Sequence, residues 1–452
     1  MNKKAFNNLP MNKITYPVFT ILLSFLLNVC AFSQDIYDLS RCIRTGLEQN
    51  YSLQLIRNNE TIAENNYTPG NAGMLPSVSA TNRYGGTVGT TNQNMYDGST
   101  NTSENVHNRS SSAGIDLTMT LFKGFQVKNT YQKLGELHEL SGLETQMNIE
   151  NLVARIVSMY NYYTQQLILY ENMAYAVSLS RERVRIDEQR YLLGGASKLE
   201  LLQSLVYLNA DSSRYARQKE VLRTAQIQLN ELMASENPGD TIVLKDTLIQ
   251  INENLVYQTL LNNTLERNTS LQIAAKGQVV SELDYRIVKS RSYPYLTMSS
   301  GYALAYNAYG TGDISSQNNH GINYGLTLGL TIFDGNNRNR EINNARIEIE
   351  NKNIRYKETE QQIKADLLTI YYAYQNNIRL LRLEEQNLDV ARENLEIALE
   401  RYKLGSLAGL ELREVQKSLL DAEERLVSVK YQAKLAEISL MQISGQIMDY
   451  LQ

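Results

Sequence analysis

Apolar residues recur at spacings of three and four along two very long stretches that contain no proline. From about Phe125 to Leu192 the recurring residues include Ile149, Leu152, Ile156, Tyr160, Tyr163, Leu167, Tyr170, Ala174 and Val177. This heptad-like stripe predicts a helix whose apolar face packs lengthwise against other helices. A matching stretch runs from about Asn336 to Lys403. At 1.5 Å per residue, each helix would span about 100 Å, which is too long for the core of a compact domain.

Each long helical pattern ends in a similar short segment, and a second helical pattern follows it. The two segments are Arg190–Leu201 (RYLLGGASKLEL) and Arg401–Leu412 (RYKLGSLAGLEL). Gly194 and Gly405 can adopt the left-handed conformation that ends a helix. In the first segment Ser197 and Glu200 fit a capping box that starts the returning helix, and the second segment lacks it. Both segments therefore predict the tip of an antiparallel helical hairpin.

The chain matches itself over most of its length. From Leu117 onward the shift is 211 residues, as in the pair Tyr160/Tyr371, and before that point it is 218, as in the pair Pro76/Pro294. One structural unit is therefore used twice. The seven-residue difference falls in a window that contains the polar run 92–112, which we expect to be a surface loop.

Alternation of apolar with small or polar residues predicts strands in each unit. In the second unit Tyr324, Leu326, Leu328, Leu330 and Ile332 alternate with Gly325, Thr327, Gly329 and Thr331. The predicted strands are about 76–91, 112–122, 294–306 and 321–333. Such strands suit a membrane barrel between lipid and water, but on this feature alone a half-buried sheet of a soluble protein is favoured, because each strand is a weak signal. Four strands are too few to close a membrane barrel, so in the first case several chains must share one.

The expected fold is therefore mainly α with a transmembrane β part, in two tandem repeats. The first repeat is 34–236, with its tip at 190–202, and the second is 254–452, with its tip at 401–412. A single helix opens each repeat, over about 35–66 and 254–289, and a turn with a short strand at 237–253 joins the two repeats.

The first 33 residues predict a secretory signal peptide. A basic segment up to Lys13 precedes an apolar run, Val18–Phe32, that is short for a membrane span. We expect cleavage after Ser33; the alternative is lipidation of Cys30. After cleavage only Cys42 remains, so no intrachain disulfide is available.

Composition narrows the classes of function. The chain of 452 residues has no Trp, only six Pro and a net charge of −4, with no basic stripe, so nucleic acid is not an expected partner. No phosphate-binding loop, nucleophile elbow or zinc-protease motif is present. His107, His138 and His320 stand apart from other metal ligands. We therefore predict no catalytic residue, metal or cofactor, and no enzyme.

The tips, the proline-opened strand pairs and the exits Leu121–Gly124 (LFKG) and Ile332–Gly335 (IFDG) occur in the same order in both repeats. Together they resemble the TolC-like outer membrane efflux proteins. The resemblance implies a homotrimer in which twelve strands form an outer membrane barrel and twelve helices form a tunnel across the periplasm. It also implies an exit duct that works with a periplasmic adaptor (membrane fusion) protein and an inner membrane efflux pump or ABC exporter. The cargo, small molecules or polypeptides, and the type of pump stay open.

The resemblance also implies roles for tip residues. The pore gate at the periplasmic mouth would consist of Glu411, Glu414, Tyr402 and Glu200. The adaptor-docking tips would consist of Arg190, Gly194, Leu199, Arg401, Gly405 and Leu410. Alternatively, the glutamates are solvated helix-start residues and the two arginines cap helix carbonyls.

The chain departs from the family at Leu407, where a familiar member carries a latch arginine; Arg413 is the candidate substitute. The alternative function is a soluble or peripheral coiled-coil adaptor or scaffold protein of the cell envelope.

Overall fold

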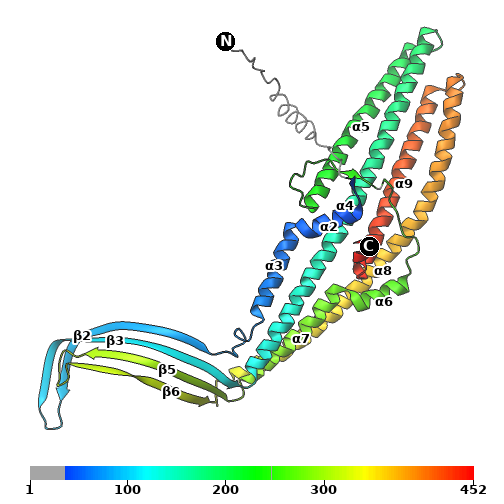
Figure 1. The fold of residues 1–452 in the computed structure, drawn as a ribbon. Helices are drawn as coiled ribbons and strands as arrows, with labels where there is room; N and C mark the ends of the chain where they lie inside the picture. The colour runs from blue at the N-terminus through cyan, green and yellow to red at the C-terminus, as the bar shows by residue number, and fades with distance from the viewer. Residues whose placement is uncertain (1–35, 246, 452) are drawn as a thin grey trace, which may run out of the picture.

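Two long helical hairpins and a four-stranded sheet make up most of the chain (Figure 1). The computed structural model describes residues 36–245 and 247–451. The first hairpin consists of α4 (Gln126–Leu192) and α5 (Lys198–Leu232), and the second of α8 (Asn337–Lys403) and α9 (Gly409–Ile443). Both long helices have 67 residues and both returning helices have 35. The predicted signal segment, its cleavage site and Cys30 lie outside the described residues.

A tight turn leads from the sheet into each long helix. Gly124 and Phe125 both have positive φ angles, +58° and +67°, and Gly335 and Asn336 repeat this with +70° and +63°. A β-carbon at Gly124 would collide with the backbone carbonyl oxygen of Ser290, so only glycine fits there. The exit motifs that the sequence repeats are these two turns.

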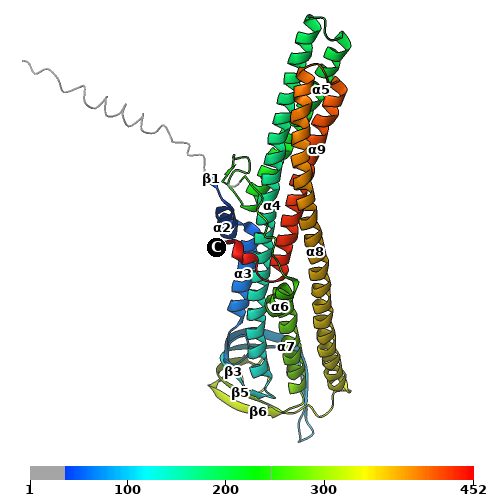
Figure 2. The same cartoon turned by 90° about the vertical axis from the view of Figure 1, so that its right-hand side faces the viewer.

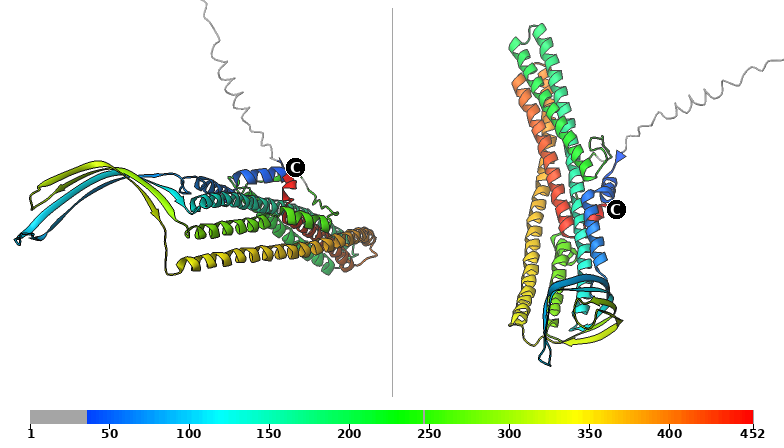
Figure 3. Two further views of the ribbon diagram at one scale, coloured as in Figure 1. Left: turned by 90° about the horizontal axis from the view of Figure 1, so that it is seen from below. Right: turned by 90° about the vertical axis from the view of Figure 1, so that its left-hand side faces the viewer.

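The sheet is antiparallel, with the strand order β2 (Ser77–Asn94), β3 (Thr100–Lys123), β5 (Tyr295–Ala308) and β6 (Ser316–Gly329). It curves strongly along its strands (Figure 3). The register places Ile115 beside Tyr302 and Tyr302 beside Ile322, so the apolar positions of neighbouring strands share one face. The opposite face is polar or small, as in the row Asp116, Gly301 and Asn323.

Two expectations about the strands are wrong. The polar run 92–112 is not a loop, because β2 extends to Asn94 and β3 begins at Thr100, with pairs such as Asn92 with Thr102 between them. Hairpin pairing uses backbone groups and does not need apolar side chains. The last strand ends at Gly329, so residues 330–333 leave the sheet before the turn at Gly335.

The single helix expected at the start of each repeat is also wrong, since each is two helices. In the first repeat they are α2 (Leu39–Gln49) and α3 (Tyr51–Asn66), and in the second α6 (Tyr257–Arg267) and α7 (Thr269–Ser290). Asn50 and Asn268 make the two breaks: each leaves helical geometry, and its side chain accepts the backbone N–H three residues later. Their side-chain amides donate to Leu232 and Ile443, which fixes the breaks against the ends of α5 and α9.

The molecule is elongated (Figure 2), and its apolar clusters lie along its length instead of filling one centre. A middle cluster includes Ile43, Val153, Ile156, Leu229 and Ile447. Near it, β1 (Ile36–Tyr37) pairs in parallel with β4 (Val243–Leu244), and the short helix η1 (Ile447–Leu451) follows α9. A second cluster fills the half of the α8–α9 hairpin that ends at the tip, and a third joins α6, α8 and α9.

Among the described residues, we found no helix that combines the length and the apolar character needed to cross a membrane. The division of the whole chain into signal, repeats and connecting segment stays a prediction.

Candidate functional site at the hairpin tips

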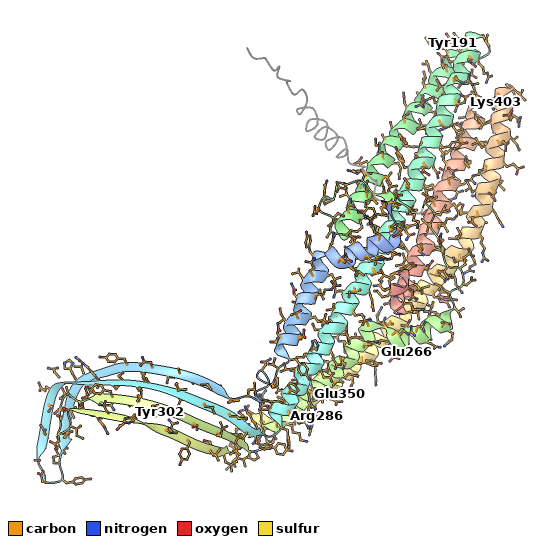
Figure 4. All side chains as sticks on the ribbon, viewed as in Figure 1. Tyr191, Glu266, Arg286, Tyr302, Glu350 and Lys403 are labelled. Atoms are coloured by element: carbon orange, nitrogen blue, oxygen red, sulfur yellow. The ribbon has the colours of Figure 1, made fainter. Side chains whose placement is uncertain are left out.

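The two hairpin tips lie next to each other at the end of the molecule far from the sheet. In Figure 4, Tyr191 marks the first tip and Lys403 the second, while Tyr302 marks the sheet at the opposite end. The predicted gate and docking residues are therefore all at one end of the chain.

Both tips use the same helix ending. Gly194 and Gly405 have φ angles of +77° and +76°, as predicted from their sequence positions. The next backbone N–H, of Gly195 or Ser406, donates to the carbonyl of Arg190 or Arg401 at 2.7 and 2.9 Å. These are the six-to-one bonds of a Schellman motif.

The returning helices begin differently. Ser197 and Glu200 form the predicted capping box: the Glu200 N–H donates to the Ser197 hydroxyl, and the Ser197 N–H donates to the Glu200 carboxylate at 2.7 Å. The carboxylate of Glu200 is therefore engaged in local capping. Ala408 caps α9 without a side-chain hydrogen bond.

The other predicted gate residues separate into two kinds. Glu411 and Glu414 are exposed at the start of α9. Tyr402 is buried, with 2% of its surface exposed. Its hydroxyl donates to the carboxylate of Asp187 on α4, and Arg190 stacks over its ring at 5.4 Å. Burial, together with the adjacent Asp187 carboxylate, raises the pKa of Tyr402 to about 12.

Arg413 does not lie free at the mouth. Its guanidinium donates two hydrogen bonds to Asp211 on α5, at 2.7 and 2.9 Å, and both residues are buried. The Ser180 hydroxyl on α4 donates to the same carboxylate. This fork geometry is the strongest form of arginine–carboxylate contact. Arg413 therefore ties the second hairpin to the first within one chain.

Tyr207 on α5 connects the two parts of this cluster. The guanidinium groups of Arg183 and Arg413 lie 5.1 and 5.0 Å from the centre of its ring. Arg183 is also 3.7 Å from the Asp187 carboxylate. We call the whole set the tip network: Ser180, Arg183, Asp187, Tyr207, Asp211, Tyr402 and Arg413. It draws on all four hairpin helices.

Five of the six predicted docking residues are exposed, and the sixth, Arg190, is half-buried. Leu199 and Leu410 are 71% and 61% exposed, one at the start of each returning helix. The Arg401 guanidinium donates a weak hydrogen bond to the carbonyl of Ser406 at 3.4 Å, which caps the helix end. The Arg190 guanidinium lies over the Tyr402 ring. Leu407, at the departure from the family pattern, packs against the apolar cluster of the second hairpin.

Sequence reasoning missed Asp187 and Asp211. A signal was available, because the repeat places Ala398 and Ala422 at the corresponding positions of the second hairpin. A carboxylate in one copy of an apolar seam, where the other copy has alanine, needs a partner.

In the part of the chain that the structure describes, no group of three or more His, Cys, Asp or Glu side chains is placed to hold a metal ion.

Comparison with known proteins shows which family and which solved structures this architecture resembles. Residues 260–446 match the family model described as outer membrane efflux protein. No curated protein sequence is significantly similar to the chain. The fold is similar to that of VceC from Vibrio cholerae, with a TM-score of 0.73 at 15% identity over 90% of this chain and 96% of that one.

The resemblance to the TolC-like outer membrane efflux proteins is confirmed. The Campylobacter jejuni CmeC outer membrane channel gives a TM-score of 0.71 at 15% identity, covering 93% of this chain and 91% of that one. The open state of the Neisseria gonorrhoeae MtrE channel gives 0.65 at 15%, covering 92% and 90%.

These matches bear on three expectations about the chain. The fold class is confirmed: long helical hairpins with a β part in two tandem repeats. The location in the outer membrane of a Gram-negative bacterium, extending into the periplasm, is confirmed. The family and fold are those of channel proteins and not of known enzymes.

Proposed function

We propose that this protein is the exit duct of a tripartite efflux or secretion system. Three copies would form one channel, which receives cargo from an inner membrane pump or ABC exporter through a periplasmic adaptor. Small molecules are the cargo that we favour, because the family model that matches the chain is described as outer membrane efflux protein.

The sheet supports a membrane role. Ile322, Tyr324, Leu326 and Leu328 lie on one face of β6 and are 67–87% exposed. The alternate residues, such as Asn323 and Thr327, face the other way. An apolar face of this extent is unusual for a sheet in contact with water, whereas lipid would cover it at no cost.

The edges of the sheet support assembly. In the order β2-β3-β5-β6, the outer edges of β2 and β6 have no strand partner within the described chain. Backbone groups at such edges cannot be left unpaired in lipid. Pairing β6 of one copy with β2 of the next would satisfy both edges and close a barrel.

The hairpins provide the observation that carries the proposal. On α4, Leu179 and Ile186 pack against the apolar cluster of the second hairpin. The repeat shift of 211 carries them to Val390 and Ile397 on α8, which are 66% and 53% exposed. The second hairpin thus presents the same apolar face as the first, and nothing in the described part of the chain covers it. The neighbour that fits is the first hairpin of another copy.

The tips would then form the periplasmic mouth. Copies of Glu411 and Glu414 from each chain would gather around the axis, where like charges attract cations. Tyr402 would act from behind this ring, since it holds α8 to α4. The exposed leucines Leu199 and Leu410 would be offered to the adaptor.

Assembly is tested with Val390→Asp and Ile397→Asp together. We expect the detergent-solubilised variant to migrate as a monomer with unchanged helical content by circular dichroism, because the aspartates cannot be buried unpaired between hairpins. Glu396→Gln changes one charge on an exposed position of the same helix and should stay trimeric. A trimeric double variant would refute the proposed contact. A wild-type chain that leaves the membrane without detergent would instead favour the soluble scaffold.

The gate is tested in planar bilayers with Glu411→Gln and Glu414→Gln together. We expect weaker block of the single-channel current by divalent cations, because the negative charge at the mouth is lost. Glu424→Gln, an exposed change farther along α9, serves as the control. Equal block in all three channels would remove both glutamates from the pore.

A further inference from the structure

We propose that a cavity in the middle of the helical layer binds an organic cation that has an apolar body. The cavity lies where α7 begins and α9 ends, between α4 and α8. Its role as a site for cargo rests on the proposed function, because it requires the cavity to face the inside of a duct. Binding itself needs only residues of one chain.

The cavity has a volume of 420 Å³, which is in the range of sites for small molecules. Thr269, the first residue of α7, and Ile443, the last residue of α9, meet there between the two long helices. We call it the junction cavity. The side chains that define its chemistry are Met147, Glu150, Ile363, Asp366, Ile370 and Ile443.

The junction cavity opens on the face of the helical layer opposite to α2 and η1. On α4, Tyr160 packs in the middle cluster with Ile43 of α2 and Ile447 of η1. Met147 and Asn151 line the cavity and lie about half a turn around α4 from Tyr160. In a closed tube α2 and η1 must lie outside, because inside they would obstruct the duct. The junction cavity would therefore face the lumen of the proposed channel.

Two carboxylates line the junction cavity, and the groups that bind them within the described chain are neutral. Glu150 is buried, with 7% of its surface exposed, and Asp366 is half-buried. Glu150 accepts hydrogen bonds from the Gln146 amide at 2.9 Å and from the Thr269 hydroxyl at 2.8 Å. Asp366 accepts one from the Gln362 amide at 2.8 Å.

These carboxylates need an opposite charge. Among the described residues that line the cavity there is no Lys, Arg or His. The N-terminus of α7, which begins at Thr269, offsets only part of the charge of Glu150 through its dipole. A buried carboxylate is normally paired with a positive charge, so a bound cation would complete the site.

Apolar side chains form the rest of the chemistry of the cavity: Met147, Ile363, Ile370 and Ile443. A metal ion would gain nothing from them, and among the described residues no three His, Cys, Asp or Glu side chains are grouped for a metal. An organic cation uses both parts, because its ammonium group pairs with the carboxylates and its apolar body contacts the isoleucines. The ligand class is therefore an amphipathic ammonium or iminium ion.

The repeat supplies a comparison site in which both carboxylates are replaced. The 211-residue shift relates Glu150 to Gln361, and Asp366 to Arg155. Arg155 lines a neighbouring cavity together with Glu231, an exposed residue. This second cavity, which we call the Arg155 cavity, has a guanidinium where the junction cavity has a carboxylate. We expect it to show no preference for cations.

Binding is measured on the full-length protein in a non-ionic detergent by fluorescence anisotropy. The probe is rhodamine 6G, an apolar cation, and the matched probe is fluorescein, which shares its xanthene core but is an anion. Glu150→Gln keeps an acceptor for Thr269 and introduces the residue that the second repeat carries, so it is compatible with the fold. Asp366→Asn is a second change, at a half-buried position, and Glu231→Gln is the matched control in the Arg155 cavity.

We expect the wild type to bind rhodamine 6G and not fluorescein. Glu150→Gln and Asp366→Asn should each weaken binding about tenfold, since a contact with a charged group is typically worth at least that factor. Glu231→Gln should bind as the wild type does. No binding by the wild type, unchanged affinity in both carboxylate variants, or an equal loss in Glu231→Gln would overturn the site.

Thiol protection locates the probe independently. Thr369 lines the junction cavity, and its counterpart Ser158 lines the Arg155 cavity. Rhodamine 6G should slow the reaction of Thr369→Cys with a maleimide and leave the rate of Ser158→Cys unchanged. Cys42 is buried and should not react. Equal protection of both cysteines, or protection of neither, would refute the location.

Planar bilayers separate this inference from the proposed function. If Glu150→Gln and Asp366→Asn conduct as the wild type does and also bind rhodamine 6G equally well, the site is refuted and the duct stands. If the wild type forms no channel, the duct is refuted. The binding measurements then still decide the site, because its lining residues belong to one chain.

Discussion

Replacing Arg413 with leucine isolates the energetic role of the tip network. Leucine is the residue that the first hairpin carries at the corresponding position, Leu202, so the change is compatible with this helical seam. It removes both hydrogen bonds to Asp211, at 2.7 and 2.9 Å. The Asp211 carboxylate, 2% exposed, keeps the Ser180 hydroxyl and a distant contact of 3.9 Å with Arg214.

The magnitude follows from this arrangement. Removing one partner of a buried ion pair costs about 3–5 kcal/mol, because the other charge is left buried. The two contacts that Asp211 keeps place the expected cost near the lower end, about 3 kcal/mol. Replacing both partners, Asp211→Ala with Arg413→Leu, recreates the chemistry of Ala422 and Leu202. This double change should cost only about 1 kcal/mol, because no buried charge remains.

Hydrogen–deuterium exchange of the trimer in detergent measures this effect locally. Exchange of amides in α5 and α9 near the tips should become about a hundredfold faster in Arg413→Leu, since 1.4 kcal/mol is a factor of ten. Amides near Val153, in the middle cluster, should not change. In the double variant the tip amides should recover most of their protection.

Additive effects of the two substitutions on hydrogen exchange would refute the reasoning. If the change in exchange free energy of the double variant equals the sum of the changes in Arg413→Leu and Asp211→Ala, the two residues do not act as a pair.

The remaining predictions concern the Tyr402 hydrogen bond and the tip glycines. The pKa of Tyr402 is raised from 10.0 to about 12, so the folded tip holds the hydroxyl proton more tightly than the unfolded chain does. The stability of the tip is therefore complete below pH 10 and falls as the pH rises toward 12. In Tyr402→Phe the stability of the tip should no longer decrease over this pH range, measured as the pH dependence of hydrogen exchange at the tip. Tyr191→Phe, at an exposed position, should keep the decrease. Equal pH profiles for the two variants would contradict the assignment. Gly405→Ala should destabilise its tip by about 1 kcal/mol through the positive φ alone, since the surrounding space is open. Limited proteolysis of the tip should then be faster, and Gly194→Ala should behave alike; an unchanged rate in both would argue against strain at these turns.

Local rules predicted the helical part of the fold well. The absence of proline and the heptad-like spacing predicted α4 and α8 to within one residue at each end, because a long helix is specified by its own periodic pattern. Gly194 and Gly405 predicted both tips for the same reason: the requirement for a positive φ is local.

Predictions from the local pattern were wrong where the backbone conformation depends on contacts with residues distant in the sequence. Asn50 lies inside an apparently continuous helical pattern, yet it ends α2, since its side chain binds both the next helix and Leu232 on another element. The polar run after Asn92 lacks apolar alternation, yet pairing across a hairpin makes it part of two strands.

The candidate site divides in the same way. The sequence by itself determined that Tyr402, Glu411 and Arg413 stand near one tip and that two similar hairpins exist. Only the tertiary structure decided that Tyr402 meets Asp187 and that Arg413 meets Asp211, residues 215 and 202 positions away. A helical pattern specifies which face of a helix is apolar, but the partner of a buried charge is chosen by which helices lie against each other, and that is decided by packing.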